Sequence, residues 1–186
     1  MTQTLAHHFR AMSRNNAWAN GRLLRACAGL QPGEFRARGT SFFPSISLTL
    51  NHNLLVDWYY VDALEGGGKG QSIFAAHEAS NDEPYPELAP LARAQAEVDH
   101  RLIAYCDALN QARLESIVRL DRGARGMLED KASDVLAHLF EHQIHHRGQA
   151  HAMLAGTSVK PPQLDEFFVS EDWKRRDAEL HQMGLN

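Results

Sequence analysis

The sequence has few cysteines, no long hydrophobic run and no block of basic residues. Its only two cysteines, Cys27 and Cys106, cannot form a disulfide framework and are typical of a reducing compartment. No apolar stretch approaches the roughly 20 residues that span a bilayer, and the polar N-terminus lacks the apolar segment of a signal peptide. Lysine and arginine total 19 against 23 acidic residues, a net charge of −4 that argues against a nucleic-acid footprint. We therefore expect a cytoplasmic protein with no membrane or nucleic-acid partner.

What the chain has in excess is histidine. It contains 11 histidines, and five of them fall between His138 and His151. Otherwise the composition, 44% hydrophobic and 23% charged, is that of an ordinary globular protein. At roughly 150 residues per domain, the length of 186 residues predicts a single domain over residues 1–186. We expect its core to span about residues 1–156 and a C-terminal extension to span about residues 157–186.

Four segments repeat apolar residues with the period of an amphipathic helix. They cover about residues 5–28, 46–65, 90–109 and 131–155. Each presents one apolar face, and the economical way to bury four such faces is a bundle. The sequence therefore predicts an all-α four-helix bundle, in up-down-up-down order or with one crossover. A short C-terminal helix is expected after Ser170, and residues 113–126 are expected to include a short extended piece.

Two of the four apolar faces contain histidine. His52 lies about 40° from Leu48 around the second helix, among residues expected to face the core. His142 and His146 each lie within about 20° of Val135 on the fourth helix. Their spacing of four residues places the Cβ atoms roughly 5–6 Å apart, so both imidazoles can reach one ion. With His52 as the third ligand, the pattern predicts a metal site that keeps an open position, as catalytic metal sites do.

The other histidines between His138 and His151 are less well oriented to bind the same ion. His138 is also four residues from His142, and with Glu141 the segment fits the His-x-x-Glu-His pattern of inverted zinc proteases. However, His138 lies about 60° and Glu141 about 120° from the centre of the apolar face. His145 and His151 point further away, so we expect both to be solvated or to contact the ligands from behind. The other interpretation is three core histidines held by hydrogen bonds without a metal.

The expected interior contains no carboxylate near the ion. Asp57 lies about 180° from Leu48 and is expected to face outward. The ion itself would then have to activate the nucleophile, a bound water or a bound thiol. The side chains expected to line the cavity or to contact the ligands from behind are Asn16, Tyr59, His138 and Gln149.

Three segments resemble the family of DinB/YfiT-like metalloenzymes. They are residues 15–24, residues 41–52 and the run HLFEHQIHHRGQ at residues 138–149, and the resemblance covers roughly residues 1–156. It implies a four-helix bundle that binds a divalent ion, usually zinc or nickel, through His52, His142 and His146. The chain departs from the family's pattern at Glu141, where Asn is expected. Members commonly form homodimers, and characterised relatives include thiol-dependent S-transferases and a mycothiol-dependent maleylpyruvate isomerase.

The sequence and this resemblance leave three functions open. The leading one is a divalent-metal enzyme that activates a low-molecular-weight thiol for S-transfer to, or isomerisation of, a small electrophile. The second is metal-assisted hydrolysis by a bound hydroxide, which needs no thiol. The third is a noncatalytic stress-response bundle whose metal is structural. The sequence chooses neither the metal, the thiol nor the small-molecule substrate.

Overall fold

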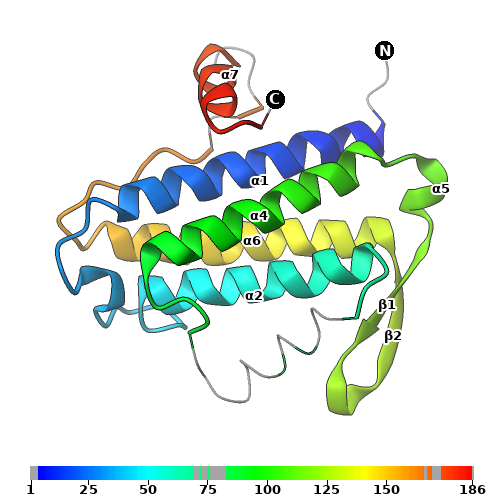
Figure 1. Cartoon of the computed structure of the whole chain (residues 1–186), viewed down its shortest axis with the longest axis horizontal. Coiled ribbons are helices and arrows are strands. Elements are labelled where there is room, and N and C mark those ends of the chain that lie inside the picture. The colour runs from blue at the N-terminus through cyan, green and yellow to red at the C-terminus, as the bar shows by residue number, and fades with distance from the viewer. Residues whose placement is uncertain are drawn as a thin grey trace.

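Four long helices make up the body of the molecule. A computed structural model of the chain describes residues 4–68, 72, 75, 83–165, 167–168 and 173–185. The structure is mostly helical and the four helices lie side by side, so the expected all-α bundle is confirmed (Figure 1). The helices are α1 (Leu5–Cys27), α2 (Ile46–Leu64), α4 (Leu88–Asp107) and α6 (Ala132–Leu154).

The order of the helices follows from their directions. In Figure 1, α2 and α4 run the same way along the bundle, whereas α1 and α6 run the opposite way. Each of α1 and α2 packs against both α4 and α6. The connection between α2 and α4 is therefore a crossover, and of the two expected orders the one with a crossover is observed.

The helix ends follow local sequence signals. Ser45 caps α2, because its side-chain oxygen accepts a hydrogen bond from the backbone N–H of Leu48 at 3.1 Å. After α2 ends, Gly66 takes a φ of +81°, a conformation that residues with a Cβ rarely adopt. Pro90 lies in the first turn of α4, where its missing N–H costs no helical hydrogen bond. The bounds of α2 and α4 therefore match the expected segments, about residues 46–65 and 90–109, to within about two residues.

A small hairpin joins α4 to α6. The short helix α5 (Gln111–Leu114) comes first. Strand β1 (Ile117–Asp121) then pairs antiparallel with β2 (Met127–Lys131), and Leu120 lies opposite Leu128. Strand β1 is the extended piece expected from the sequence. The two strands are separated by the 3-10 turn η2 (Gly123–Arg125), and a second such turn, η1 (Glu34–Arg36), lies between α1 and α2.

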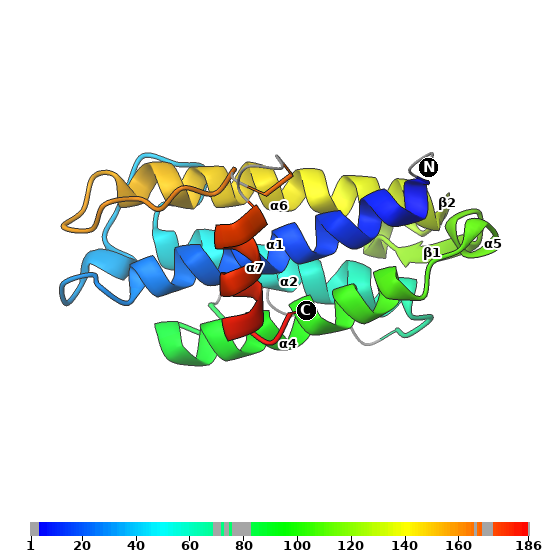
Figure 2. The ribbon, with the colours of Figure 1, turned by 90° about the horizontal axis from the view of Figure 1, so that it is seen from above.

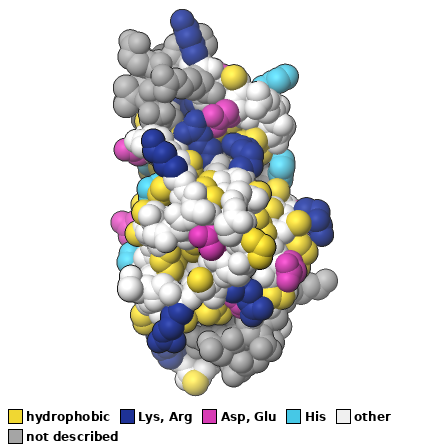
Figure 3. All heavy atoms as spheres, turned by 90° about the vertical axis from the view of Figure 1, so that its left-hand side faces the viewer, with side chains coloured by type: hydrophobic (Ala, Val, Ile, Leu, Met, Phe, Trp, Pro, Cys, Tyr) yellow, Lys and Arg dark blue, Asp and Glu magenta, His cyan; other side chains and the backbone are white. Residues whose placement is uncertain are grey.

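The C-terminal helix α7 (Trp173–Gln182) crosses over α1 and reaches α4 (Figure 2). Phe167 and Leu180 are buried there against Trp18 of α1 and Ile103 of α4. The short helix expected at this end is therefore present, although its expected cap at Ser170 lies outside the described residues. On the end of the molecule drawn in Figure 3, basic and acidic side chains are interspersed with hydrophobic ones. Among the described residues, no helix is long and apolar enough to span a membrane.

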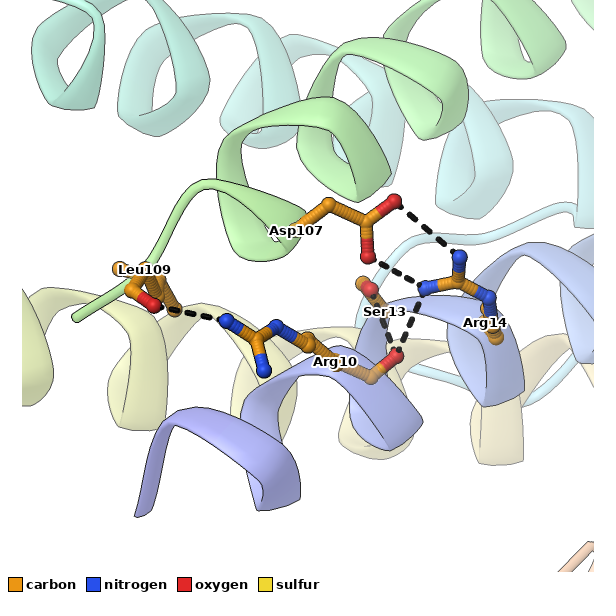
Figure 4. Close-up of polar contacts among 5 residues, drawn as sticks. All are labelled: Arg10, Ser13, Arg14, Asp107 and Leu109. Atoms are coloured by element: carbon orange, nitrogen blue, oxygen red, sulfur yellow. Dashed lines mark hydrogen bonds and ion pairs between the residues drawn. The ribbon is translucent and has the colours of Figure 1, made fainter. Parts of the chain in front are cut away.

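Polar contacts at one end of the bundle join α1 to α4 (Figure 4). Arg14 forms a bidentate ion pair with Asp107, with N–O distances of 2.8 and 3.1 Å. Arg10 donates to the carbonyl oxygen of Leu109 at 2.8 Å. The contact from Arg10 satisfies a carbonyl just past the end of α4, where no further helical turn supplies a donor.

The middle of the bundle holds a buried polar layer, formed by side chains from all four helices. Arg147 Nη1 donates to the Oδ1 atoms of Asn16 and Asn20, at 2.6 and 2.9 Å. The two asparagine amides donate in turn to Asp99 at 3.1–3.2 Å. Gln95 donates from Nε2 to Asp99 at 3.2 Å and to Asp57 at 2.7 Å. The members of the layer are Asn16, Asn20, Asp57, Gln95, Asp99, Gln143 and Arg147, all of them buried.

The prediction that Asp57 faces outward is wrong, since its side chain is only 1% exposed. The reason is that α2 is buried on more than one side. Leu50, Leu54 and Val61 lie on the side of α2 away from Leu48, and all three are buried. Asp57 shares that second buried side and points into the layer.

The layer contains two carboxyl groups and one guanidinium. Burial, and next the charge of Asp99, raises the pKa of Asp57 to about 8. Burial raises the pKa of Asp99 to about 6, although the hydrogen bonds from Asn20 and Gln95 oppose this shift. Burial also lowers the pKa of Arg147 to about 10, although both carboxylates oppose this shift. At neutral pH Asp57 is therefore protonated and uncharged. The carboxylate of Asp99 then balances the guanidinium of Arg147.

This charge balance predicts a pH-dependent stability that Asp57→Asn removes. Asp57 is protonated in the folded protein and ionised in the unfolded chain between about pH 4 and 8, so folding takes up a proton and rising pH opposes it. Relative to Asp57→Asn, the unfolding free energy of the wild type should fall by up to about 1.4 kcal/mol per pH unit between pH 5 and 8. Urea denaturation at each pH measures it. The exposed Asp134→Asn is the control, and parallel wild-type and Asp57→Asn curves would contradict the prediction.

Candidate metal centre

Three imidazoles from two helices converge on one point. His52 comes from α2, and His142 and His146 come from successive turns of α6, which packs against α2. One ligand atom from each of them lies within 4.8 Å of the others. The Nε2 atoms of His52 and His142 are 3.1 Å apart. Two nitrogens bound tetrahedrally to one zinc ion at about 2.0–2.1 Å are separated by about 3.3 Å, so this spacing fits two ligands of one ion.

The third imidazole is oriented by a neighbour on its own helix. His146 Nδ1 lies 2.8 Å from Oε1 of Gln149, which can only accept, so Nδ1 carries the proton and Nε2 is left free. Gln149 in turn donates from Nε2 to Nε2 of His145 at 3.0 Å. Gln149 therefore fixes the tautomer and the ring orientation of His146, as partners of metal-binding histidines do.

Burial keeps the three imidazoles uncharged. Burial, and next the charge of His146, lowers the pKa of His52 to about 4. The same two causes lower the pKa of His142 to about 3. Burial also lowers the pKa of His146, although the hydrogen bond to Gln149 opposes the shift. Neutral imidazole is the form that binds a metal ion, so the three ring nitrogens are available at neutral pH.

Phe43 covers one side of the imidazole cluster. Its ring centroid lies 4.3 Å from that of His52 and 5.5 Å from that of His146. The loop that carries Phe43 packs closely on α6, since a Cβ added to Gly39 would lie 2.7 Å from Sδ of Met153. Phe43 is not recognisable as a site residue from the sequence, because its ring reaches the histidines from a loop without periodicity.

The other residues expected near the ion lie in different surroundings. His138 is exposed, and its ring centroid is 6.3 Å from that of His142. Tyr59 is buried and donates its hydroxyl to the carbonyl oxygen of Asp121 at 2.8 Å. Asn16 belongs to the buried polar layer, whereas Gln149 forms a hydrogen bond with His146.

The inverted-protease pattern is not assembled. Glu141 is exposed, and neither it nor His138 belongs to the group of three converging ligands. His145 is exposed and contacts Gln149, whereas His151 Nε2 lies 2.8 Å from the carbonyl oxygen of Pro162. In the part of the chain that the structure describes, this group of three is the one set of His, Cys, Asp and Glu side chains spaced to hold an ion.

Comparison with known proteins identifies the family. The model of the DinB family matches residues 1–177. The chain belongs to the DinB family. Protein DinB of Bacillus subtilis (strain 168) is 24% identical over 148 residues, which cover 78% of this chain and 85% of that protein. The match to the DinB family extends further than the segments in which the resemblance was visible, since it includes the start of α7.

The donor set of this DinB-family chain suits a divalent ion. Three neutral imidazoles without a carboxylate accept zinc, nickel, cobalt, copper or iron, and the order of affinities does not select among them. Three protein ligands also leave at least one position for a further molecule. That the three histidines bind a metal stays a prediction, which the variants below test.

Replacing one imidazole should abolish tight metal binding. We expect His142→Ala to lose more affinity for zinc than the roughly 10–100-fold typical of a residue that only contacts a ligand. The bundle should stay helical, because His142 is half-buried and removing it deletes no member of the buried polar layer. Elemental analysis after gel filtration measures bound metal, and circular dichroism measures helix. His100→Ala, at an exposed position of α4, is the control, and equal metal content in wild type and His142→Ala would show the assignment to be wrong.

Gln149 should affect the ion through His146. Gln149→Leu removes the acceptor for His146 Nδ1, so we expect roughly 10–100-fold weaker zinc binding in competition with a chelator. Gln149→Glu keeps an acceptor for His146 and loses the donor to His145, so it should retain most of the affinity. If Gln149→Leu bound zinc as tightly as the wild type, Gln149 would have no positioning role.

Proposed function

We propose that this DinB-family protein binds one divalent metal ion through His52, His142 and His146 and transfers a low-molecular-weight thiol to a small electrophile. The observation that carries the proposal is the convergence of three uncharged imidazoles with no fourth His, Cys, Asp or Glu of the described residues in the group. A set of three protein ligands is typical of catalytic ions, whereas structural ions usually have four.

The chemistry divides between the ion and the protein. A divalent ion in this position would lower the pKa of a bound thiol enough to deprotonate it. The three imidazoles would hold the ion, and Phe43 covers one side of His52 and His146. No basic side chain is required, because the thiol proton passes to solvent. The thiolate sulfur would form the bond to the electrophilic carbon, and the leaving group would depart with its electron pair.

Thiol-dependent turnover tests this function. The zinc- and nickel-loaded protein should accelerate the reaction of a thiol such as cysteine with 1-chloro-2,4-dinitrobenzene, in which a C–S bond forms and chloride leaves. His142→Ala should lose the acceleration. In the cobalt-loaded protein, the thiol should also produce a sulfur-to-metal absorption band. The His100→Ala variant serves as the matched control.

Three outcomes would overturn the proposal. Hydrolysis of a nitrophenyl ester by the loaded protein without any thiol, together with no thiol-dependent transfer, would favour a hydrolase. A bound ion that takes no thiol and catalyses neither reaction would favour a noncatalytic bundle. Equal thiol transfer by the wild type and His142→Ala would separate the activity from this site. The homodimer implied by the family resemblance and the cytoplasmic location expected from the composition stay predictions.

A further inference from the structure

The tip of the β-hairpin is held against α2 by two tyrosines. Tyr59 donates its hydroxyl to the carbonyl oxygen of Asp121 at 2.8 Å, at the end of β1. The next residue, Arg122, donates from Nη2 to the hydroxyl oxygen of Tyr60 at 2.8 Å. The centre of its guanidinium lies 5.5 Å from the centroid of each of the two rings. These contacts fix where the guanidinium lies relative to α2.

Arg122 has spare hydrogen-bonding capacity and no counter-charge. Its side chain is half-buried, and no carboxylate of the described residues lies within ion-pair distance of it. The adjacent carboxylate of Asp121 accepts instead from the backbone N–H of Gly123 at 2.8 Å. A guanidinium carries five N–H donors, and the phenol of Tyr60 takes one of them. The remaining donors form the planar fork that matches a carboxylate.

A continuous row of side chains leads from Arg122 to the metal centre. The ring of Tyr60 meets that of His138 edge-on, with centroids 5.3 Å apart. The ring of His138 lies 6.3 Å from that of His142, one helical turn further along α6. His138 is exposed, and no hydrogen bond occupies its ring nitrogens among the described residues. Arg122 and His138 thus both lie next to the ring of Tyr60, and His138 also lies next to the candidate ligand His142.

We propose that Arg122 and His138 form an anion subsite that binds the carboxylate of a small molecule whose other end reaches the metal centre. One guanidinium balances one negative charge, which favours a singly charged carboxylate. The inference rests on the proposed function and specifies it, because it assigns the substrate class as carboxylate-bearing. The competing interpretation is that Arg122 only anchors the hairpin to α2.

Thiols of graded length test the subsite through binding rather than turnover. The probes are ω-mercaptocarboxylates with one to six methylene groups and the mercaptoalcohols of the same lengths, titrated calorimetrically into the zinc-loaded protein. At the length that spans the two sites, the carboxylate should bind at least about tenfold more tightly than the alcohol, as expected for a charge-assisted hydrogen bond. A wild type with no such preference at any length would overturn the proposal.

Variants of the hairpin separate binding from anchoring. Arg122→Gln should abolish the preference for the carboxylate and leave alcohol binding unchanged, whereas Arg122→Lys should keep part of it. Arg125→Gln, at an exposed position on the same hairpin tip, is the matched control and should keep all of it. His138→Gln, on the exposed side of α6, should weaken the preference several-fold even if Arg122→Gln proves unstable. An undiminished preference in both Arg122→Gln and His138→Gln would show that the carboxylate binds elsewhere.

A dicarboxylate distinguishes failure of this subsite from failure of the proposed function. If neither thiol series binds but glutarate binds and loses affinity in Arg122→Gln, the thiol chemistry is wrong and the anion subsite stands. If the mercaptoalcohols bind and the carboxylates gain nothing, the metal–thiol site stands and the anion subsite is wrong. If glutarate and both series fail to bind, both proposals are wrong.

Discussion

The structure depends on one buried cation, the guanidinium of Arg147. It lies in the middle of the bundle and donates to Asn16 and Asn20 across the interface between α6 and α1. A hydrogen bond to a charged group contributes roughly 1.5–3 kcal/mol. Because the buried polar layer takes side chains from all four helices, no helix can slide or rotate without leaving a buried polar group unpaired. The layer therefore fixes the register of helices that an apolar core alone would hold less specifically.

This register also determines where the candidate ligands lie. On α6, His142 and His146 are followed directly by Gln143 and Arg147, which belong to the layer. Neighbouring residues on an α-helix point about 100° apart, so one pair faces the ion site while the other faces the interior. The four-residue spacing within each pair is the same, and a rotation of α6 that moved one pair would move the other. The geometry of the metal centre is thus coupled to the polar interior.

Much of this arrangement is predictable from sequence, and the exceptions have physical causes. Helical periodicity locates the bundle helices and places His52 on the inward side of α2, far along the chain from His142 and His146. It fails for Asp57, because one apolar face was assigned to a helix that has two. Leu50, which is buried close to the direction of Asp57, was the signal of the second face. The hydrogen-bond partner of Asp57 is Gln95 on α4, so the periodicity of α2 alone cannot predict this contact.

The hairpin marks a different limit. Strand β1 alternates exposed and buried residues and is recognisable from the sequence, whereas all five residues of β2 are exposed and show no alternation. The position of Arg122 depends on contacts between the hairpin and α2. Asp121 contacts Tyr59 and Arg122 contacts Tyr60, and each pair is separated by 62 residues in the chain. Under the proposals above, the bundle then sets the chemistry, because its helices fix the three imidazoles. The hairpin sets the reach and charge of the substrate, because it carries the guanidinium of Arg122, which Tyr59 and Tyr60 hold against α2.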